Sequence, residues 1–185
     1  MPPRPAHSTP FFTIGHSTRP LDEFVALLAA SEVARVIDVR SFPRSRTNPQ
    51  YNVDALPQSL AAHGIGYEHV AAFGGKRPRQ KAVPEETNAF WEVEGFHNYA
   101  DYALGEEFRR AFEQLLETGD RERVAVMCAE AVWWRCHRRI IADYLLAAGR
   151  DVWHILARDN VEPAKMTPAA RPGPHGAIVY PFALS

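Results

Sequence analysis

Basic side chains are concentrated in three segments that contain no acidic residue. Segments 40–51, 74–81 and 135–139 hold 10 of the 21 Lys and Arg residues of the chain. The planar guanidinium group of arginine forms paired hydrogen bonds with phosphate and carboxylate oxygens. If these segments meet in space, they form an anion-binding site.

A cysteine near these segments has the position of a reactive thiol. Cys128 follows the apolar run Val124–Met127 and precedes a helical pattern. Amide groups at a helix N-terminus and nearby arginines favour the thiolate, so we predict Cys128 as nucleophile or redox thiol. The alternative is a small buried residue, because free cysteine is often part of a core. The carboxylate of Glu130, two residues away, disfavours a negative charge on Cys128. Glu130 is itself a candidate general acid or base.

Two histidines are candidates for moving protons in this site. His16 follows the first apolar run, and His137 lies on the predicted sheet-facing side of a helix together with Cys136. We interpret Cys136 as a core residue. A buried imidazole needs polar partners, so His137 is either a base or orienting group, or a structural histidine. The candidate catalytic residues are therefore Cys128, Glu130, His16 and His137.

The candidate anion-binding residues combine arginine, lysine and hydroxyl donors: Arg40, Arg44, Arg46, Arg138, Ser17, Ser41 and Lys76. Asp38 and Arg40 lie two residues apart on a strand, hence on one face, and we expect an ion pair between them. The expected partner is an anionic small molecule. The alternative is a nucleic acid, with the arginine loop on phosphates and Trp133 and Trp134 stacked on bases.

A metal site is the third alternative, as a metal-dependent hydrolase. Structural zinc usually binds paired knuckles such as Cys-x2-Cys, and the cysteines and histidines of this chain lack such spacing. We therefore expect no metal and no other cofactor.

Short apolar runs and helical patterns alternate along the chain. Strands are predicted at 11–14, 36–39, 67–70, 124–127 and 152–156. Helices are predicted after a cap at Ser17 or Thr18, before His63-Gly64, from Tyr99 to an end at Gly119, and over 134–148. This order predicts a single compact α/β domain, a mostly parallel five-stranded sheet with helices on both faces.

The predicted topology brings the polar motifs together. In a parallel sheet the carboxyl ends of all strands lie at one edge, where ligands bind. Each motif follows a strand, so we expect Gly15-His16-Ser17, the segment from Arg40 to Arg46, Gly74-Gly75-Lys76 and Cys128-Ala129-Glu130 to converge there.

Composition is typical of a globular protein. The 185 residues are 46% hydrophobic and 23% charged, with a formal net charge of -1, which excludes a generally basic nucleic-acid coat. We expect residues 1–10 to be disordered, residues 11–156 to form the domain, and residues 157–185 to be a Pro-rich tail, on the domain or disordered. No apolar run is long enough to span a membrane, and two cysteines do not make a disulfide scaffold. The expected location is the cytoplasm.

The ordered set of motifs resembles a known family. Thr13-Ile14-Gly15-His16-Ser17, then 38–46 with Asn48-Pro49 and Tyr51-Asn52, Gly74-Gly75, Cys128-Ala129-Glu130 and 136–139 are similar to the domain-of-unknown-function family 488 of bacteria and archaea. The resemblance spans about residues 11–156. It implies a compact α/β domain and a shared site at these motifs, with no established activity.

A more distant likeness is to rhodanese-type sulfur transferases and cysteine-dependent phosphatases. Ile37-Asp38-Val39-Arg40 and a cysteine after a later strand, with an arginine beyond it, are similar to that pattern. The segment between Cys128 and Arg135 departs from it, because it is longer than the usual anion-binding loop and has no glycine.

Overall fold

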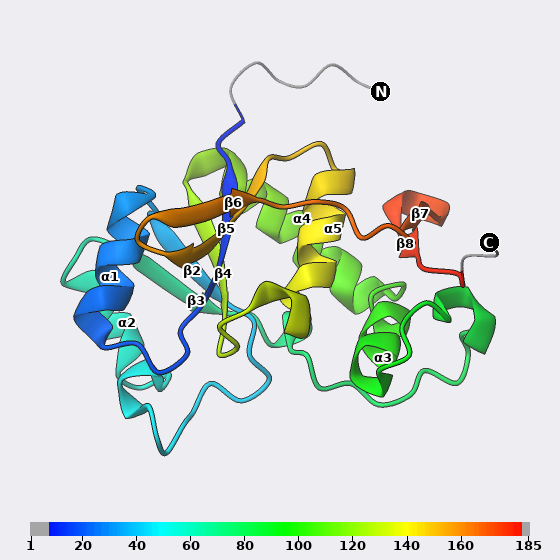
Figure 1. The fold of residues 1–185 in the computed structure, drawn as a ribbon, viewed down its shortest axis with the longest axis horizontal. Helices are drawn as coiled ribbons and strands as arrows, with labels where there is room; N and C mark the ends of the chain where they lie inside the picture. The colour runs from blue at the N-terminus through cyan, green and yellow to red at the C-terminus, as the bar shows by residue number, and fades with distance from the viewer. Residues whose placement is uncertain (1–7, 183–185) are drawn as a thin grey trace.

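A computed structural model describes residues 8–182 as two layers of helices around a central sheet (Figure 1). The sheet contains β1 (Phe11–Gly15), β2 (Arg35–Asp38), β3 (Gly66–His69), β4 (Val124–Cys128), β5 (Val152–Ala157) and β6 (Asn160–Pro163). The helices are α1 (Leu21–Ala30), α2 (Leu56–Ala61), α3 (Glu94–Tyr102), α4 (Glu106–Arg121) and α5 (Arg138–Ala147). Residues 1–7, within the segment expected to be disordered, and 183–185, within the expected tail, lie outside the described residues.

The sheet has six strands rather than the five predicted. Their order is β3-β2-β4-β1-β5-β6, and the first five are parallel. The sixth strand runs antiparallel to β5 and comes from the segment predicted as a tail. It is a largely exposed edge strand without an alternating apolar pattern, so the sequence gives no signal for it.

Each face of the sheet is covered by its own helices and has its own core. On one face, α1 and α2 enclose a cluster that includes Phe24, Leu28 and Leu60. On the other face, residues of α3, α4 and α5 form a larger cluster. Figure 1 shows these two groups of helices on opposite sides of the strands. The prediction of a mostly parallel α/β sheet with helices on both faces is therefore confirmed.

Strand β4 and its two neighbours in the sheet are followed by helices on opposite faces. Strands β1 and β2 are followed by α1 and α2 on one face, whereas β4, which lies between them, is followed by α5 on the other. Connections that leave neighbouring strands toward opposite faces open a crevice at the carboxyl ends of those strands, the usual ligand position in open α/β sheets. Cys128, the last residue of β4, lies at this point.

The segment after Ala157 lies on the domain as far as it is described. Asp143 in α5 accepts hydrogen bonds from the Thr167 amide at 2.9 Å and from the Tyr180 hydroxyl at 2.8 Å. A short hairpin of β7 (Arg171–Pro172) and β8 (Ile178–Val179) belongs to the same segment. Because α5 is covered by the sheet on one side and by this segment on the other, it buries more than one stripe of side chains.

Several predicted helix boundaries were wrong. The helix predicted from residue 134 begins only at Arg138, after a 3-10 turn at Trp133–Arg135. Gly119 lies inside α4, which continues to Arg121, and a separate α3 precedes α4. A Cβ at Gly119 would lie 2.0 Å from the ring of Phe11, so this glycine is needed for close packing and not for a turn. Neither Ser17 nor Thr18 caps α1, which begins after Pro20 without a side-chain cap.

We expect Gly119→Ala to lower the free energy of unfolding by about 1–3 kcal/mol, the usual cost of overpacking a core. The Phe11 ring is fully buried, so moving it would disturb the closely packed core around it. Urea denaturation measures the change. Gly95→Ala in α3 is the matched control, because a Cβ there meets no atom within 4 Å, and it should leave stability unchanged or raise it slightly. Equal stabilities of the two variants would contradict the packing argument.

Candidate functional site

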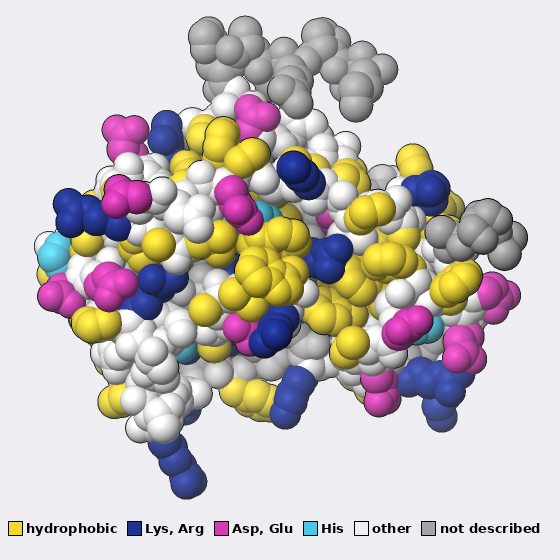
Figure 2. Space-filling view, viewed as in Figure 1, with side chains coloured by type: hydrophobic (Ala, Val, Ile, Leu, Met, Phe, Trp, Pro, Cys, Tyr) yellow, Lys and Arg dark blue, Asp and Glu magenta, His cyan; other side chains and the backbone are white. Residues whose placement is uncertain are grey.

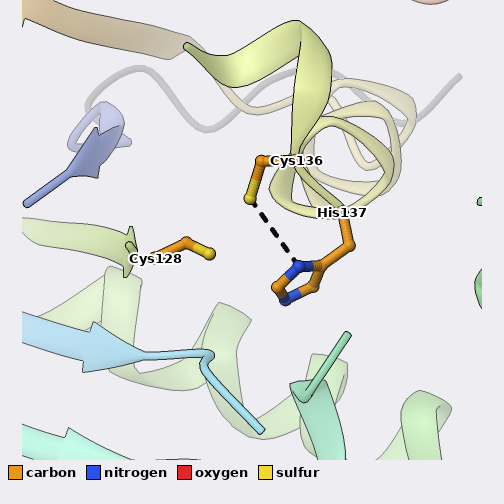
Figure 3. A group of neighbouring side chains, drawn as sticks. All are labelled: Cys128, Cys136 and His137. Carbon is orange, nitrogen blue, oxygen red and sulfur yellow. Dashed lines mark hydrogen bonds between the residues drawn. The ribbon is translucent and has the colours of Figure 1, made fainter. Parts of the chain in front are cut away.

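Two cysteines and a histidine face one another at the carboxyl end of β4 (Figure 3). The ligand atoms of Cys128, Cys136 and His137 all lie within 4.8 Å of one another. Cys128 ends the strand, and the other two residues lie directly before α5. We call these three residues the thiol cluster.

His137 presents an acceptor nitrogen to the sulfur of Cys136. Its Nε2 lies 2.9 Å from the carbonyl oxygen of Val39, at the end of β2, and its Nδ1 lies 3.6 Å from the Cys136 Sγ. A carbonyl can only accept, so Nε2 carries the proton, and in the neutral ring Nδ1 has a free lone pair. The Cys136 thiol can therefore donate its proton to His137.

The two thiols have opposite pKa shifts. Burial opposes ionisation of Cys136, but a hydrogen bond from Cys128 and the charge and amide of Arg138 outweigh it and lower the pKa to about 7. The hydrogen bond with Cys136, followed by burial, raises the pKa of Cys128 to about 12. The sequence predicted Cys128 as the ionised thiol, whereas the structure favours a thiolate on its neighbour.

Arg138 supplies an unusual buried positive charge next to Cys136. Its residue is 0% exposed, and its guanidinium donates to the carbonyl oxygens of Glu130 at 2.5 Å and Ala131 at 3.1 Å and to the Thr13 hydroxyl at 3.4 Å. Between residues 8 and 182, no carboxylate lies within ion-pair distance of it. The amide of Arg138 also points at the Cys136 Sγ, at 3.5 Å. A buried cation with only neutral acceptors favours a nearby anion.

The motifs expected at the sheet edge do meet there. The amide of His16 donates to the Cys128 carbonyl at 2.9 Å, which joins the first motif to the thiol cluster. A Cβ on Gly15 would lie 1.8 Å from the Glu130 carbonyl oxygen, and one on Gly75 would lie 2.5 Å from the His137 Nδ1. These two glycines are therefore needed because other groups approach their backbone closely.

Gly75→Ala should disturb the His137 ring without unfolding the protein. The added Cβ must displace Nδ1, and this displacement removes the acceptor from the Cys136 thiol. We expect slower alkylation of Cys136 near neutral pH, measured by mass spectrometry of the labelled peptide. Gly95→Ala, at a position where a Cβ meets no atom within 4 Å, provides a glycine control without such a clash. Unchanged labelling in a folded Gly75→Ala protein would contradict the importance of this nitrogen.

His16 and Arg40 are held in a buried network beside the cluster. Arg40 donates to both carboxylate oxygens of Asp38, at 2.9 and 2.7 Å, and to the Tyr51 carbonyl at 2.6 Å. His16 accepts from Arg40 at Nε2, donates to the Ser17 carbonyl at Nδ1 and stacks on Tyr51. Burial is the main reason that the pKa of His16 falls to about 4. The ion pair expected between Asp38 and Arg40 is therefore present. The polar groups of His16 and Arg40 are bonded to other groups of the protein.

The other predicted basic residues lie on the surface. Arg44 pairs with Asp54 at 3.3 Å, and Arg46 is exposed. Lys76 lies over the ring of Phe42, which is 69% exposed. Figure 2 shows Lys and Arg side chains of the viewed face separated by hydrophobic and acidic ones, without one continuous basic patch.

The remaining predicted residues support the backbone of the site. Ser41 accepts a hydrogen bond from the Lys76 amide at 2.9 Å. Ser17 has a positive φ of 49°, and its amide donates to the Ala129 carbonyl. Glu130 is exposed and accepts from the Val132 amide at 3.4 Å, so its carboxylate does not take part in the thiol cluster.

The thiol cluster could also hold a metal ion. Two sulfurs and one imidazole nitrogen suit a soft cation such as Zn²⁺, with one position left for water or substrate. The hydrogen bond from His137 to the Val39 carbonyl is the second interaction that often orients a ligating histidine. No other group of this kind occurs in the described part of the chain.

A large cavity elsewhere in the fold is apolar. It has a volume of about 860 Å³ and lies between α4, α5 and the β7–β8 hairpin, with walls that include Phe108, Phe112, Tyr144 and Ile178. None of the predicted site residues lines it. It therefore offers space but no reactive side chain from the motifs.

Cys136 is the residue whose importance the sequence reasoning underestimated. It is buried, as expected of a core residue, but it also contacts His137 and the Arg138 amide. The sequence signal was its place next to His137 and Arg138 at the start of a helix. The Val39 carbonyl had no sequence signal, because a backbone group carries no residue type.

Comparison with known proteins adds one match. A family model described as Domain of unknown function DUF488 matches residues 20–145, a range that includes the whole thiol cluster. No curated protein and no solved structure matches the chain. None of the helices between residues 8 and 182 has the length and apolar character needed to cross a membrane.

Proposed function

The chain belongs to this family of unknown function, and from that premise we propose that it is a thiol-dependent enzyme with Cys136 as the nucleophile. The substrate is a small molecule bound at the carboxyl end of β4, whose following helix lies on the opposite face from those that follow β1 and β2. Cys128 is the neighbouring protonated thiol, and His137 is the proton acceptor. Free thiols of this kind favour a reducing compartment such as the cytoplasm.

The observation that carries this proposal is the buried charge of Arg138. A cation removed from water and bonded only to neutral oxygens is costly unless an anion lies near it. The charge of Arg138 lowers the pKa of the Cys136 thiol, and the Arg138 backbone amide contacts the same sulfur at 3.5 Å. Ionisation of this thiol would neutralise the site, and the same charge makes the sulfur a better nucleophile at neutral pH.

The first proton transfer follows from the placement of His137. The Cys136 proton moves to Nδ1 over the 3.6 Å contact, and the resulting imidazolium keeps its Nε2–H on the Val39 carbonyl. The ring then faces the sulfur with a positive charge, which stabilises the thiolate. A substrate needs only an electrophilic atom that reaches Cys136, and the charge of Arg138 favours substrates with anionic groups.

The pH dependence of alkylation tests this proposal. Reduced protein is treated with iodoacetamide across the neutral range, and peptide mass spectrometry identifies the labelled cysteine. We expect labelling at Cys136 with a midpoint near pH 7, because the pKa of this thiol is lowered to about 7 and the thiolate fraction rises as pH passes that value. Preferential labelling at Cys128, or a midpoint at the pKa of an ordinary cysteine, would refute the assignment.

Metal analysis separates this proposal from the competing metal-dependent hydrolase. A metal centre predicts zinc or iron near one equivalent in the purified protein, and protection of both cysteines from alkylation until the metal is removed with a chelator. The thiol enzyme predicts that alkylation of Cys136 is the same with and without chelator. Alkylation of Cys136 therefore either depends on the chelator, as a metal centre predicts, or does not, as the thiol enzyme predicts.

A further inference from the structure

Nucleophilic chemistry at Cys136 uses the second thiol of the cluster only as a hydrogen-bond partner. Cys128 faces Cys136 across the end of the sheet (Figure 3), and the two sulfurs lie within 4.8 Å of each other and of a ring nitrogen of His137. These are the only two cysteines of the chain. A disulfide within one molecule can therefore form only between them.

We infer that Cys136 and Cys128 together reduce small hydroperoxides, with Cys136 as the attacking sulfur and Cys128 as the sulfur that resolves the product into a disulfide. This inference rests on the proposed function, because it needs Cys136 as the nucleophile. It adds the substrate class and a second chemical step, which the proposed function leaves open.

The first step breaks the oxygen–oxygen bond of the hydroperoxide. The Cys136 thiolate attacks one peroxide oxygen, the sulfur becomes a sulfenic acid, and the alkoxide or hydroxide leaves with a proton from the His137 imidazolium. Two electrons pass from sulfur to oxygen. His137 is then neutral and can accept another proton.

The second step forms the disulfide. Cys128 gives its proton to His137, and its sulfur attacks the sulfenic sulfur of Cys136. The sulfur–oxygen bond breaks, and the hydroxide takes the proton and leaves as water. In sum, two thiols and one hydroperoxide give one disulfide, one alcohol or water, and one water. An external dithiol restores both cysteines by exchange and becomes a disulfide itself.

The local backbone allows the sulfurs to approach. A disulfide needs a sulfur–sulfur distance of about 2.05 Å, shorter than their present separation. Cys128 is the last residue of β4, but Cys136 lies in the short connection between the 3-10 turn Trp133–Arg135 and α5. Cys136 therefore lies outside the regular hydrogen bonding of β4 and α5, and closing the disulfide requires no rearrangement within either element.

Burial limits the oxidant to a small molecule. Cys128 is 9% exposed and Cys136 is 4% exposed. A protein disulfide could not reach the Cys136 sulfur without opening the fold, whereas hydrogen peroxide is about the size of two water molecules. The geometry therefore favours hydroperoxides over protein disulfides as the electron acceptor.

Oxidation of the reduced full-length protein with one equivalent of hydrogen peroxide tests the inference. We expect an intact mass lower by two hydrogen atoms, loss of both free thiols, and full recovery with dithiothreitol. Nonreducing electrophoresis should show a monomer, since the bond is internal. Cys128→Ser should stop at the sulfenic acid, trapped by dimedone at Cys136, and Cys136→Ser should give neither product.

The control and the contrary outcomes are distinct. Arg135→Met, a neighbouring exposed position, should form the disulfide as the wild type does. If Cys136 is alkylated as proposed but peroxide leaves Cys128 as a free thiol, or acts no faster than on free cysteine, the inference fails and the proposed function stands. If Cys136 is not the residue alkylated, both fail.

Discussion

Replacing Cys136 with serine is expected to lower the rate of thiol alkylation at pH 7 at least ~10-fold. The substitution removes the thiol whose pKa is lowered to about 7 and leaves Cys128. It also removes the hydrogen bond that is the main cause of the raised pKa of Cys128. Burial remains, so the second thiol stays mostly protonated at this pH. The rate constant of alkylation, from labelling reactions quenched at successive times, measures this decrease.

Cys128→Ser is the matched variant for this measurement. A serine hydroxyl can still donate a hydrogen bond to the Cys136 sulfur, so the labelling rate of Cys136 should stay close to that of the wild type. The reverse pattern, with fast labelling lost in Cys128→Ser and kept in Cys136→Ser, would return the nucleophile to Cys128, as the sequence alone predicted. Circular dichroism of both variants checks that the fold is intact.

Replacing Arg138 with methionine is expected to raise the midpoint pH of Cys136 alkylation by ~1–3 units, the usual effect of one nearby opposite charge. The buried Arg138 guanidinium is the positive charge that lowers the pKa of Cys136. Without it the thiolate loses its neutralising charge, so the thiol stays protonated to higher pH. The alkylation profile over the neutral and alkaline range measures the shift.

Two further variants separate charge from folding in this experiment. Arg138→Met also leaves the carbonyl groups of Glu130 and Ala131 without their donor, at about 1–3 kcal/mol for each buried group. Arg138→Lys keeps the charge with fewer donors, so its midpoint should stay near that of the wild type even if stability falls. Arg135→Met, at an exposed position in the same segment, should change neither the midpoint of Cys136 alkylation nor the stability of the protein. A folded Arg138→Met protein with an unshifted midpoint would remove the electrostatic basis of the proposal.

The parallel core of the sheet was predictable because it is locally encoded. Runs such as Val124–Met127 are apolar and bounded by polar residues, and helical spacing between them predicts crossovers to parallel neighbours. The same reasoning places the motifs at one edge, where the His16 amide meets the Cys128 carbonyl. Chain ends and edges were less predictable. Strand β6 pairs with β5 through backbone groups alone, and its largely exposed side chains carry no apolar alternation.

The roles of glycines show the same division. Gly64 and Gly149 follow α2 and α5 with positive φ, as expected of glycines at helix ends. Gly119 looked similar in the sequence but lies inside α4 against Phe11. A glycine required by its own dihedral angles can be recognised locally, whereas one required by a distant side chain cannot.

The sequence by itself determined the class of fold and the edge of the sheet where His16, Cys128 and His137 lie. Only the tertiary structure decided which sulfur is better placed to ionise. Residue types report what a side chain can do, but its pKa depends on groups brought near it in three dimensions. The Val39 carbonyl comes from almost one hundred residues away, and the Arg138 charge acts on Cys136 because the fold buries it without a carboxylate.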